Sequence, residues 1–330
     1  MTETRFDVVG TGNAIVDVLG HASDSFLDVN DLVKGAMTLV DAETSERIYG
    51  RMGPAVECSG GSGANTIAAL ALLGGRGAFI GKVRDDQLGA VFGHDIRASG
   101  MHFETPLATD GPPTARCLIF VTPDAHRTMQ TYLGACVNLT PEDIDEDVIA
   151  EAKVTYMEGY LWDPPQAKEA FRKAARIAAG AGRLVSLSLS DPFCVDRHRE
   201  DFLDLIDNHV DVLFANEDEI VSLYQAADFD DALQQVRGHC KIAALTRSEK
   251  GAVIVAGDEV HVLDAEPVER VVDTTGAGDA YAAGFLWGLT RDLDLATCGR
   301  LGAVVAAEII GHMGARPDIP LRQLVNDRLG

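Results

Sequence analysis

Short apolar segments rich in β-branched residues alternate along this chain with longer segments rich in alanine and leucine. Several of the short segments are continuously apolar, which is typical of strands that helices cover on both faces. The alternation therefore predicts an α/β fold with a doubly wound, mostly parallel sheet. The expected strands are Phe6–Gly10, Ala78–Lys82, Val154–Met157, Leu184–Leu189, Val212–Ala215, Ile242–Thr246, Val253–Val255 and Val260–Leu263. The expected helices include Asn65–Leu73, Gln166–Ala179 and the stretches that follow Asp279 and Arg300.

Two segments interrupt this alternation and predict a small β lid on the α/β body. His21–Asp41 is short and polar, and Thr114–Leu133 holds two strand-like halves around the turn-forming residues 123–126. We therefore expect one domain over residues 1–330, with lid segments at about 17–45 and 105–135. An exposed lid sheet can pair with a second copy of the chain, so a homodimer formed through the lid stays open.

The charge balance excludes nucleic acid as a partner. The 51 acidic residues outnumber the 28 basic ones, which gives a formal net charge of −23. A DNA duplex carries one negative charge about every 1.7 Å and needs a basic protein face, which this sequence does not offer. The other proportions, 46% hydrophobic and 24% charged, are those of an ordinary globular protein.

The sequence also predicts a cytoplasmic protein that makes no membrane contact. Its longest nearly apolar stretches, Thr66–Leu73 and Ala280–Leu289, are shorter than the roughly 18–20 residues that a membrane span requires. The N-terminus has no hydrophobic segment of the kind that a secretory signal carries. The six cysteines form no CxxC pair and no zinc-spaced cluster, so we expect them to be reduced.

Two nucleotide-binding patterns match only in part. Gly10–Ile15 has the first two glycines of the dinucleotide fingerprint GxGxxG, but Ile15 replaces the third. Gly81 and Lys82 resemble the end of a Walker A loop, but Val83 stands where that loop needs serine or threonine. The sequence therefore indicates neither a Rossmann dehydrogenase nor a P-loop enzyme.

The sequence DTTGAGD at Asp273–Asp279, followed by the apolar run Ala280–Leu289, predicts an anion-binding turn. A turn at Gly276–Gly278 that enters a helix leaves backbone N–H groups unpaired at the positive end of the helix dipole. Asp279 would lie in the first helical turn, where we expect the dipole to lower its pKa, as suits a general base. The alternative is a plain helix cap in which Asp279 has no chemical role.

Two other groups of residues fit a site for a ligand with hydroxyl groups. The Gly-rich segment Ser59–Asn65 opens a second apolar helix, and Asn65 offers both a donor and an acceptor to ligand hydroxyls. Asn13 and Asp17 follow the first strand, and open α/β sheets bind ligands at the carboxyl ends of their strands. A plain strand-to-helix turn and an Asx turn are the respective alternatives.

Two further pairs fit phosphate and metal chemistry. Asn216 and Glu219 share a helix face and can together hold Mg²⁺ through waters, although acidic residues in a first turn also simply favour the helix dipole. Arg116 and Arg127 lie one on each strand of the expected hairpin. A closing lid can bring one of them to a phosphate, and solvated edge arginines are the alternative.

Taken together and in this order, these segments resemble the ribokinase-like (PfkB) family of carbohydrate and nucleoside kinases. Gly60–Gly89, which ends in GKVRDDQLG, is similar to the first signature of the family, and Val272–Gly284 is similar to the second. Gly12–Asp17, Ala152–Tyr160 and Ser188–Phe193 are similar to the adenosine kinase-like branch.

The resemblance implies an enzyme that transfers the γ-phosphate of ATP, with Mg²⁺, to a hydroxymethyl group. The implied catalytic residues are the base Asp279 and the anion hole formed by Gly276, Ala277 and Gly278. The implied substrate site comprises Asn13, Asp17, Gly61, Ser62 and Asn65, to which the lid adds Arg127. The implied ATP and Mg²⁺ site comprises Asn216, Glu219, Thr246, Gly251, Thr275, Gly276 and Gly278. Ser248 replaces the first glycine of the family's TxGxxG pattern at Thr246–Gly251.

The closer likeness implies a purine nucleoside as the acceptor. A PfkB sugar kinase acting on ribose, fructose or 2-keto-3-deoxygluconate is the main alternative, and a non-catalytic ligand sensor is the less favoured one. Family members often respond to K⁺ near the second signature, and the sequence leaves open whether this chain does.

Overall fold

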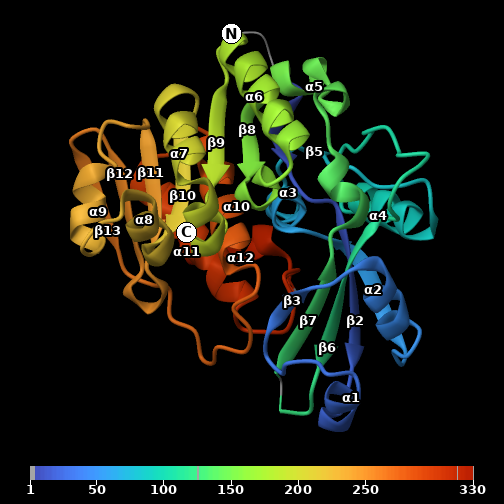
Figure 1. Ribbon diagram of the computed structural model, residues 1–330. Helices are drawn as coiled ribbons and strands as arrows, with labels where there is room; N and C mark the ends of the chain where they lie inside the picture. Colours follow the sequence, from blue (N-terminus) through green and yellow to red (C-terminus); the bar gives the residue numbers. More distant parts are fainter. Residues whose placement is uncertain (1–3, 125, 318, 330) are drawn as a thin grey trace.

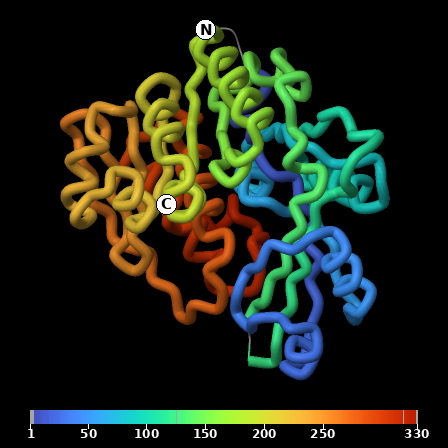
Figure 2. The backbone as a smooth tube through the Cα atoms, in the orientation of Figure 1, coloured from blue at the N-terminus to red at the C-terminus, as the bar shows by residue number. Residues whose placement is uncertain are grey.

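A computed structural model describes residues 4–124, 126–317 and 319–329 of the chain. A large α/β body carries a small second sheet that projects from one side (Figure 1). Figure 2 shows that blue and green parts of the chain, which are separated in sequence, combine in this small sheet. None of the described helices is long and apolar enough to cross a bilayer. All six cysteines lie in the described ranges and are free thiols, as predicted.

The body contains an eight-stranded sheet in the order β13-β12-β11-β10-β9-β8-β1-β5. The strands from β5 to β11 run parallel, whereas β12 and β13 are antiparallel at one edge. The predicted mostly parallel sheet is therefore confirmed. The strands are β1 (Phe6–Thr11), β5 (Gly77–Ile80), β8 (Ala152–Glu158), β9 (Leu184–Ser188), β10 (Val212–Asn216), β11 (Ile242–Thr246), β12 (Ala252–Ala256) and β13 (Glu259–Leu263).

Helices cover both faces of this sheet because successive strand residues point to opposite sides. In β1, Val8 belongs to one hydrophobic core and Val9 to the other, and in β10 Phe214 and Leu213 divide in the same way. The first core takes residues from α3 (Ser62–Leu72), α4 (Gln87–Ala98), α10 (Ala277–Leu289), α11 (Leu295–Ile309) and α12 (Leu321–Leu329). The second takes residues from α5 (Glu146–Ala150), α6 (Pro165–Gly180), α7 (Pro192–Asn208), α8 (Glu217–Tyr224) and α9 (Phe229–Gln235).

The small sheet has five strands in the order β3-β7-β6-β2-β4. Its strands are β2 (Ile15–His21), β3 (Met37–Leu39), β4 (Ala55–Gly60), β6 (Ala115–Val121) and β7 (Arg127–Tyr132), and the same region holds α1 (Asp24–Val29) and α2 (Ala42–Tyr49). β6 and β7 pair antiparallel, as the hairpin prediction requires, although Ala125 in the predicted turn lies outside the described residues. β4 lies beyond the two predicted lid segments, so the sheet uses more of the chain than expected.

Short 3₁₀ helices complete the fold at Gly134–Asn138, Pro141–Asp143, Gly159–Trp162 and Ser248–Lys250.

The helices α10 and α11 pack so closely that glycine is required at their contact. A Cβ atom added at Gly284 in α10 would lie 2.6 Å from the backbone oxygen of Leu301 and 2.9 Å from the Cα of Gly302. We therefore expect Gly284→Ala to lower the free energy of unfolding by about 1–3 kcal/mol, as overpacking does. Urea denaturation measures this change.

Gly180 in α6 provides the matched control, because a Cβ added there meets nothing within 4 Å. Gly180→Ala should leave the stability unchanged or raise it by roughly 0.4–1 kcal/mol. Equal denaturation midpoints for the two variants would contradict the packing argument.

Candidate active site

Two glycine-rich turns meet near the carboxyl ends of β1 and β8. One turn precedes α3 and the other precedes α10. The Oγ of Ser62, at the start of α3, donates a hydrogen bond of 2.6 Å to Oδ1 of Asp279 in the first turn of α10. No side chain caps either helix in the described structure, so N–H groups of both first turns stay available to a ligand. The fold thus brings the two predicted turns together.

Only glycine fits at the entry to each helix. Gly61 has φ +96°, and a Cβ atom there would lie 2.1 Å from the backbone oxygen of Asn13. Gly276 has φ +79°, and a Cβ atom there would lie 2.6 Å from the Cβ of Ala315. The glycines therefore let four separate stretches of chain approach one another at the site, those around Asn13, Gly61, Gly276 and Ala315.

The predicted direction of the Asp279 pKa shift is wrong. Burial raises this pKa to about 6, while hydrogen bonds from Ser62 and Asn65 and the charge of Arg316 lower it. The helix dipole and these donors therefore do not offset the loss of hydration in the folded protein. At neutral pH the carboxylate is still mostly ionised, because its pKa lies below 7.

Asn65 carries a buried acceptor atom that has no partner. Its side chain hydrogen-bonds Asp279, yet its Oδ1 has no hydrogen-bond partner within the described part of the chain. The residue is only 7% exposed. An unpaired buried oxygen costs free energy unless a donor arrives, so a ligand hydroxyl at this point would be stabilising.

The buried carboxylate of Glu158, which the sequence did not single out, joins Asn13 to the first glycine-rich turn. Its Oε1 accepts from Asn13 Nδ2 at 2.7 Å, and its Oε2 accepts from the backbone N of Gly63 at 2.7 Å and of Asn13 at 3.3 Å. Burial raises the pKa of Glu158 to about 7. The Oδ1 of Asn13 also accepts from the thiol of Cys136 at 3.0 Å, so the amide of Asn13 is fixed in orientation from both sides.

Asp17 belongs to β2 of the small sheet and reaches the same site from there. Gly60 makes room for it, since a Cβ atom added at Gly60 would lie 2.4 Å from the Asp17 carboxyl carbon. Burial raises the pKa of Asp17 to about 6, and the charges of Arg316 and Arg127 lower it. The repulsion between Asp17 and Asp279 raises it further, which indicates that the two carboxylates share one site.

The two hairpin arginines have different partners, and both are largely buried. Arg116 donates to Ser45 Oγ at 2.7 Å and to Glu46 Oε2 at 2.6 Å, so its guanidinium is committed to α2. Arg127 forms an ion pair with Asp273, and their side chains are 7% and 8% exposed. The expectation of solvated edge arginines is therefore wrong for both residues, and only Arg127 faces the second turn.

Of the residues expected to bind ATP and Mg²⁺, Asn216 and Thr246 end neighbouring parallel strands and are paired in register. Asn216 caps α8, because its side-chain oxygen accepts a hydrogen bond from the backbone N of Glu219 at 2.9 Å. The carboxylate of Glu219 in turn accepts hydrogen bonds from the backbone N and from Nδ2 of Asn216, at 2.9 and 2.6 Å. Gly251 has φ +83°, and a Cβ atom there would lie 2.0 Å from the backbone oxygen of Leu263. Thr275 donates its N–H to Asp273 Oδ1 at 3.0 Å.

These residues fit a metal ion that is held mainly by phosphates and water. Glu219 already uses both carboxylate oxygens in its bonds to Asn216, and burial raises its pKa to about 7. The described residues contain no group of three or more His, Cys, Asp or Glu side chains able to hold a metal. Mg²⁺ typically binds through one or two carboxylates, substrate phosphates and several waters, so Glu219 fits as an outer partner.

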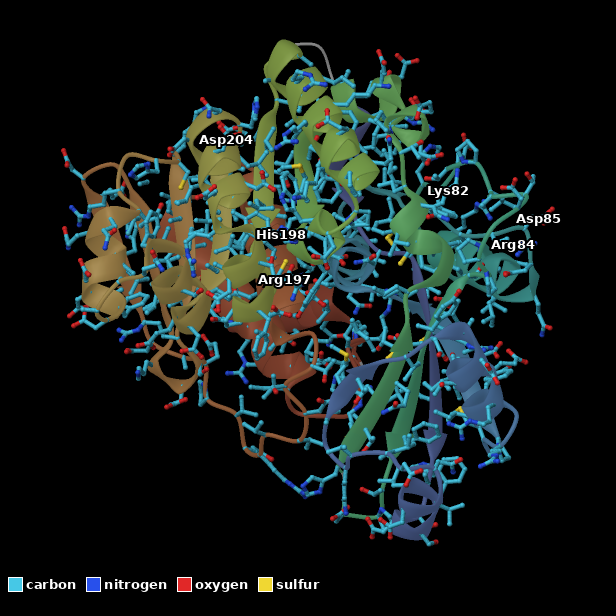
Figure 3. The ribbon with its side chains drawn as sticks, viewed as in Figure 1. Lys82, Arg84, Asp85, Arg197, His198 and Asp204 are labelled. Atoms are coloured by element: carbon cyan, nitrogen blue, oxygen red, sulfur yellow. The ribbon has the colours of Figure 1, made fainter. Side chains whose placement is uncertain are left out.

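Lys82 and Arg84 of the GKVRDDQLG segment form contacts within the body of the protein. Figure 3 shows Lys82, Arg84 and Asp85 at the edge of the body, near α4. Lys82 pairs with Asp143 at 2.5 Å, and Arg84 donates to the backbone oxygen of Gly111. Lys82 is therefore not held as a P-loop lysine would be, in line with the sequence analysis.

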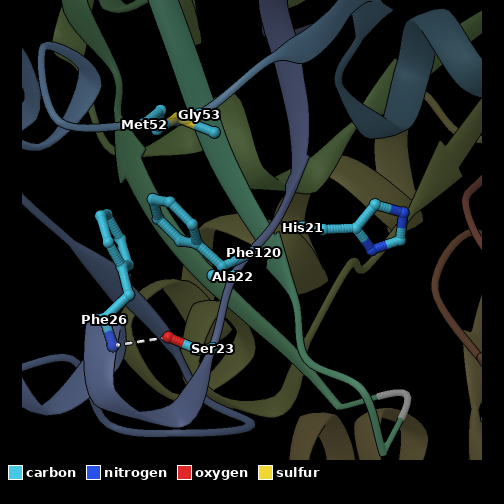
Figure 4. A pocket seen from close by; sticks show the side chains of 7 residues that line it. All are labelled: His21, Ala22, Ser23, Phe26, Met52, Gly53 and Phe120. Atoms are coloured by element: carbon cyan, nitrogen blue, oxygen red, sulfur yellow. Dashed lines mark hydrogen bonds between the residues drawn. The ribbon is translucent and has the colours of Figure 1, made fainter.

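A cavity of about 160 Å³ lies at the small sheet, beside α1 and β6 (Figure 4). None of the predicted site residues lines it. Its lining residues are His21, Ala22, Ser23, Phe26, Met52, Gly53 and Phe120.

Comparisons with known proteins show the family and the fold of the chain. Residues 37–322 match the model of the pfkB family of carbohydrate kinases. A probable sugar kinase from Rhizobium etli and an adenosine kinase from Sinorhizobium meliloti, both crystal structures, are each 54% identical to this chain, with TM-scores of 0.90. Each alignment covers 98% of this chain and 99% of the other. A probable chloroplastic fructokinase of Arabidopsis thaliana is 29% identical over 296 residues, which cover 82% of this chain and 74% of the relative.

The family model covers most of the chain, and the similar structures extend over nearly all of it. The family implies that ATP is the phosphate donor and that Mg²⁺ accompanies it. The chain therefore belongs to the pfkB family of carbohydrate kinases and is a phosphotransferase that acts on an alcohol group of a nucleoside or a sugar.

Proposed function

We propose that this enzyme transfers the γ-phosphate of ATP to the hydroxymethyl group of a purine nucleoside, with Asp279 as the general base. The hydrogen bond between Ser62 and Asp279 carries the proposal, because it puts a largely ionised carboxylate between two helix N-termini. A base beside an anion-binding turn is the arrangement that attack by a hydroxyl on a phosphate requires.

The choice of a nucleoside over a free sugar rests on similarity. The Sinorhizobium adenosine kinase is 54% identical over nearly the whole chain, well above the 29% identity to the fructokinase. The Rhizobium protein, which is equally similar, is described as a probable sugar kinase, and this keeps a sugar acceptor as the second candidate. Both kinds of acceptor offer hydroxyl groups to Asn13, Asp17 and Asn65.

In the proposed reaction, the substrate hydroxyls bind between the small sheet and the first turn, at Asn13, Asp17, Gly61, Ser62 and Asn65. Asp279 accepts the proton of the hydroxymethyl group as its oxygen attacks the γ-phosphorus. The backbone N–H groups of Gly276–Gly278 stabilise the charge on the transferring phosphoryl group. Mg²⁺, when bound with ATP, neutralises phosphate charge, and Asn216, Thr246, Gly251 and Thr275 line the ATP side.

Arg127 is proposed to grip the transferred phosphate when the small sheet closes. Its Nε is buried with no partner within the described residues, so a phosphate oxygen would satisfy a donor that lacks an acceptor. Asp273 would stay hydrogen-bonded if Arg127 moved, since it also accepts from the backbone N of Thr275 and of Gly314, each at 3.0 Å. Arg127 can therefore exchange partners at modest cost.

The acceptor is tested by measuring phosphate transfer from ATP with Mg²⁺ to adenosine, inosine, guanosine, cytidine, ribose, fructose and 2-keto-3-deoxygluconate. We expect the highest kcat/KM with a purine nucleoside. A higher value with a free sugar would favour the sugar kinase. Tight binding without transfer to any acceptor would favour a non-catalytic sensor and contradict the proposal.

The base is tested with Asp279→Asn, which keeps an oxygen that can accept from Ser62. We expect kcat to fall by on the order of 10²–10⁴, the usual contribution of a general base, while ATP and the nucleoside still bind. In the wild-type enzyme, kcat/KM should fall as the pH drops through about 6, because protonation of Asp279 removes the base. Steady-state kinetics measures the loss of kcat and its pH dependence, and calorimetric titration measures whether ATP and the nucleoside still bind.

Asp204→Asn is the matched control, since Asp204 is an exposed residue of α7 and lies far from the turns (Figure 3). It should leave kcat unchanged. Near-normal turnover by Asp279→Asn would rule out the assigned base.

The phosphate grip is tested by comparing Arg127→Ala with Arg116→Ala. The first should lower kcat/KM for ATP by about 10–100-fold, which is the loss of one charge-assisted hydrogen bond. The second should leave it nearly unchanged, because Arg116 is committed to Ser45 and Glu46. Equal effects of the two substitutions on kcat/KM would contradict a specific role for Arg127.

A further inference from the structure

One short segment near the end of the chain contacts both glycine-rich turns. The backbone N of Gly314 donates to Asp273 Oδ2 at 3.0 Å, at the start of the second turn. Ala315 packs against Gly276, where only the absence of a side chain makes room for it. Arg316 reaches the other turn, so Gly314–Arg316 forms a strap across the site.

Arg316 holds the first turn at Ser59. Its Nη2 donates to the backbone oxygen of Ser59 at 2.6 Å and to Ser59 Oγ at 2.8 Å. Ser59 is itself fixed by Asp95 of α4, whose Oδ2 accepts from Ser59 Oγ at 2.5 Å and from Ser59 N at 2.8 Å. Ser59 lies two residues before Gly61, and therefore a displacement of Ser59 would shift the start of α3 and Ser62.

The guanidinium of Arg316 also faces an unusual set of charges. The carboxylates of Asp17 of β2, Asp95 of α4 and Asp279 of α10 stabilise its charged form against burial. The thiol of Cys58 of β4 faces it too but is neutral at neutral pH, because burial raises its pKa to about 11. The charge of Arg127 of β7 also lowers the pKa of Asp17. Repulsion from Asp279 raises the pKa of Glu158 of β8. Arg127 is paired with Asp273, whereas the charge of Arg316 acts on both Asp17 and Asp279 and lowers the pKa of each.

We propose that Arg316 is a positioning residue for phosphate transfer: it fixes the first turn through Ser59 and supplies the positive charge that Asp17 and Asp279 share. This inference rests on the proposed function, because it assigns Arg316 a role through the base and the acceptor-binding carboxylate. Arg316 itself need not touch the substrate. Its charge lowers the proton affinity of both carboxylates, which burial would otherwise raise further.

The test is the pH dependence of kcat/KM for the wild type, Arg316→Gln and Arg316→Lys with the preferred acceptor. At low pH, kcat/KM falls as Asp279 becomes protonated, and this part of the pH profile is its acid limb. Loss of the positive charge in Arg316→Gln should raise the pKa of Asp279, so the acid limb should move to higher pH by on the order of 0.5–1 unit. Arg316→Lys keeps the charge and should retain the wild-type limb. The flexible lysine side chain lacks the planar guanidinium that fixes the two Nη2–H directions toward Ser59, so it should hold the first turn less rigidly and its plateau kcat should be lower.

Arg97→Gln is the control for a merely structural loss. Arg97 also donates to backbone oxygens, those of Phe103 and Gly93, but it lies on α4 and does not act on Asp279. It should leave the acid limb in place. Circular dichroism and thermal unfolding show whether each variant is folded.

The outcomes separate this inference from the proposed function. A wild-type enzyme that phosphorylates no acceptor removes the proposed function. An active wild type whose acid limb is unchanged in folded Arg316→Gln overturns the role of Arg316 alone. If Arg316→Gln does not fold, Arg316→Lys is the deciding variant. An acid limb at the wild-type pH together with a lower kcat supports the proposal. A shifted acid limb or an unchanged kcat contradicts it.

Discussion

The hydrogen bond from Ser62 to Asp279 joins the first turns of two helices, through residues that lie 217 positions apart in the sequence. The rest of the site depends on this junction. It aligns the N-termini of α3 and α10 so that both face one space, and it holds the Asp279 carboxylate there. Because the junction needs close approach of backbone segments, Gly61 and Gly276 occur where any side chain would collide. The close packing of α10 against α11 then keeps the second turn in place.

Burial gives the site its chemical character. Asp17, Glu158 and Asp279 all have pKa values raised by loss of hydration. Keeping each of these carboxylates ionised in the buried site therefore costs free energy. Backbone donors and Arg316 reduce that cost locally. The net charge of −23 therefore does not prevent an anionic substrate from binding. Helix N-termini and a few cations act on the substrate at short range, whereas salt screens the more distant negative charges of the surface.

Most of the body fold and both turns could be predicted from local sequence, because runs of β-branched residues and glycines before apolar helices are local signals. The roles of Glu158 and Arg316 could not, since their partners lie 95 and 257 residues away. The pKa of Asp279 was predicted in the wrong direction for the same reason: the helix dipole is visible in the sequence, but burial is not. α7 is not among the expected helices, and its backbone departs from helical geometry at His198.

In the proposed reaction Asp279 deprotonates a hydroxymethyl group, whose oxygen then receives the γ-phosphoryl group. The most direct measurement compares the preferred nucleoside with its 5′-deoxy analogue, in which hydrogen replaces that hydroxyl, by ³¹P NMR of the products. We expect a 5′-monophosphate from the parent nucleoside and no phosphorylated product from the analogue, although the analogue still binds. A phosphorylated 5′-deoxynucleoside would show that another hydroxyl is the acceptor and would rule out the proposed reaction.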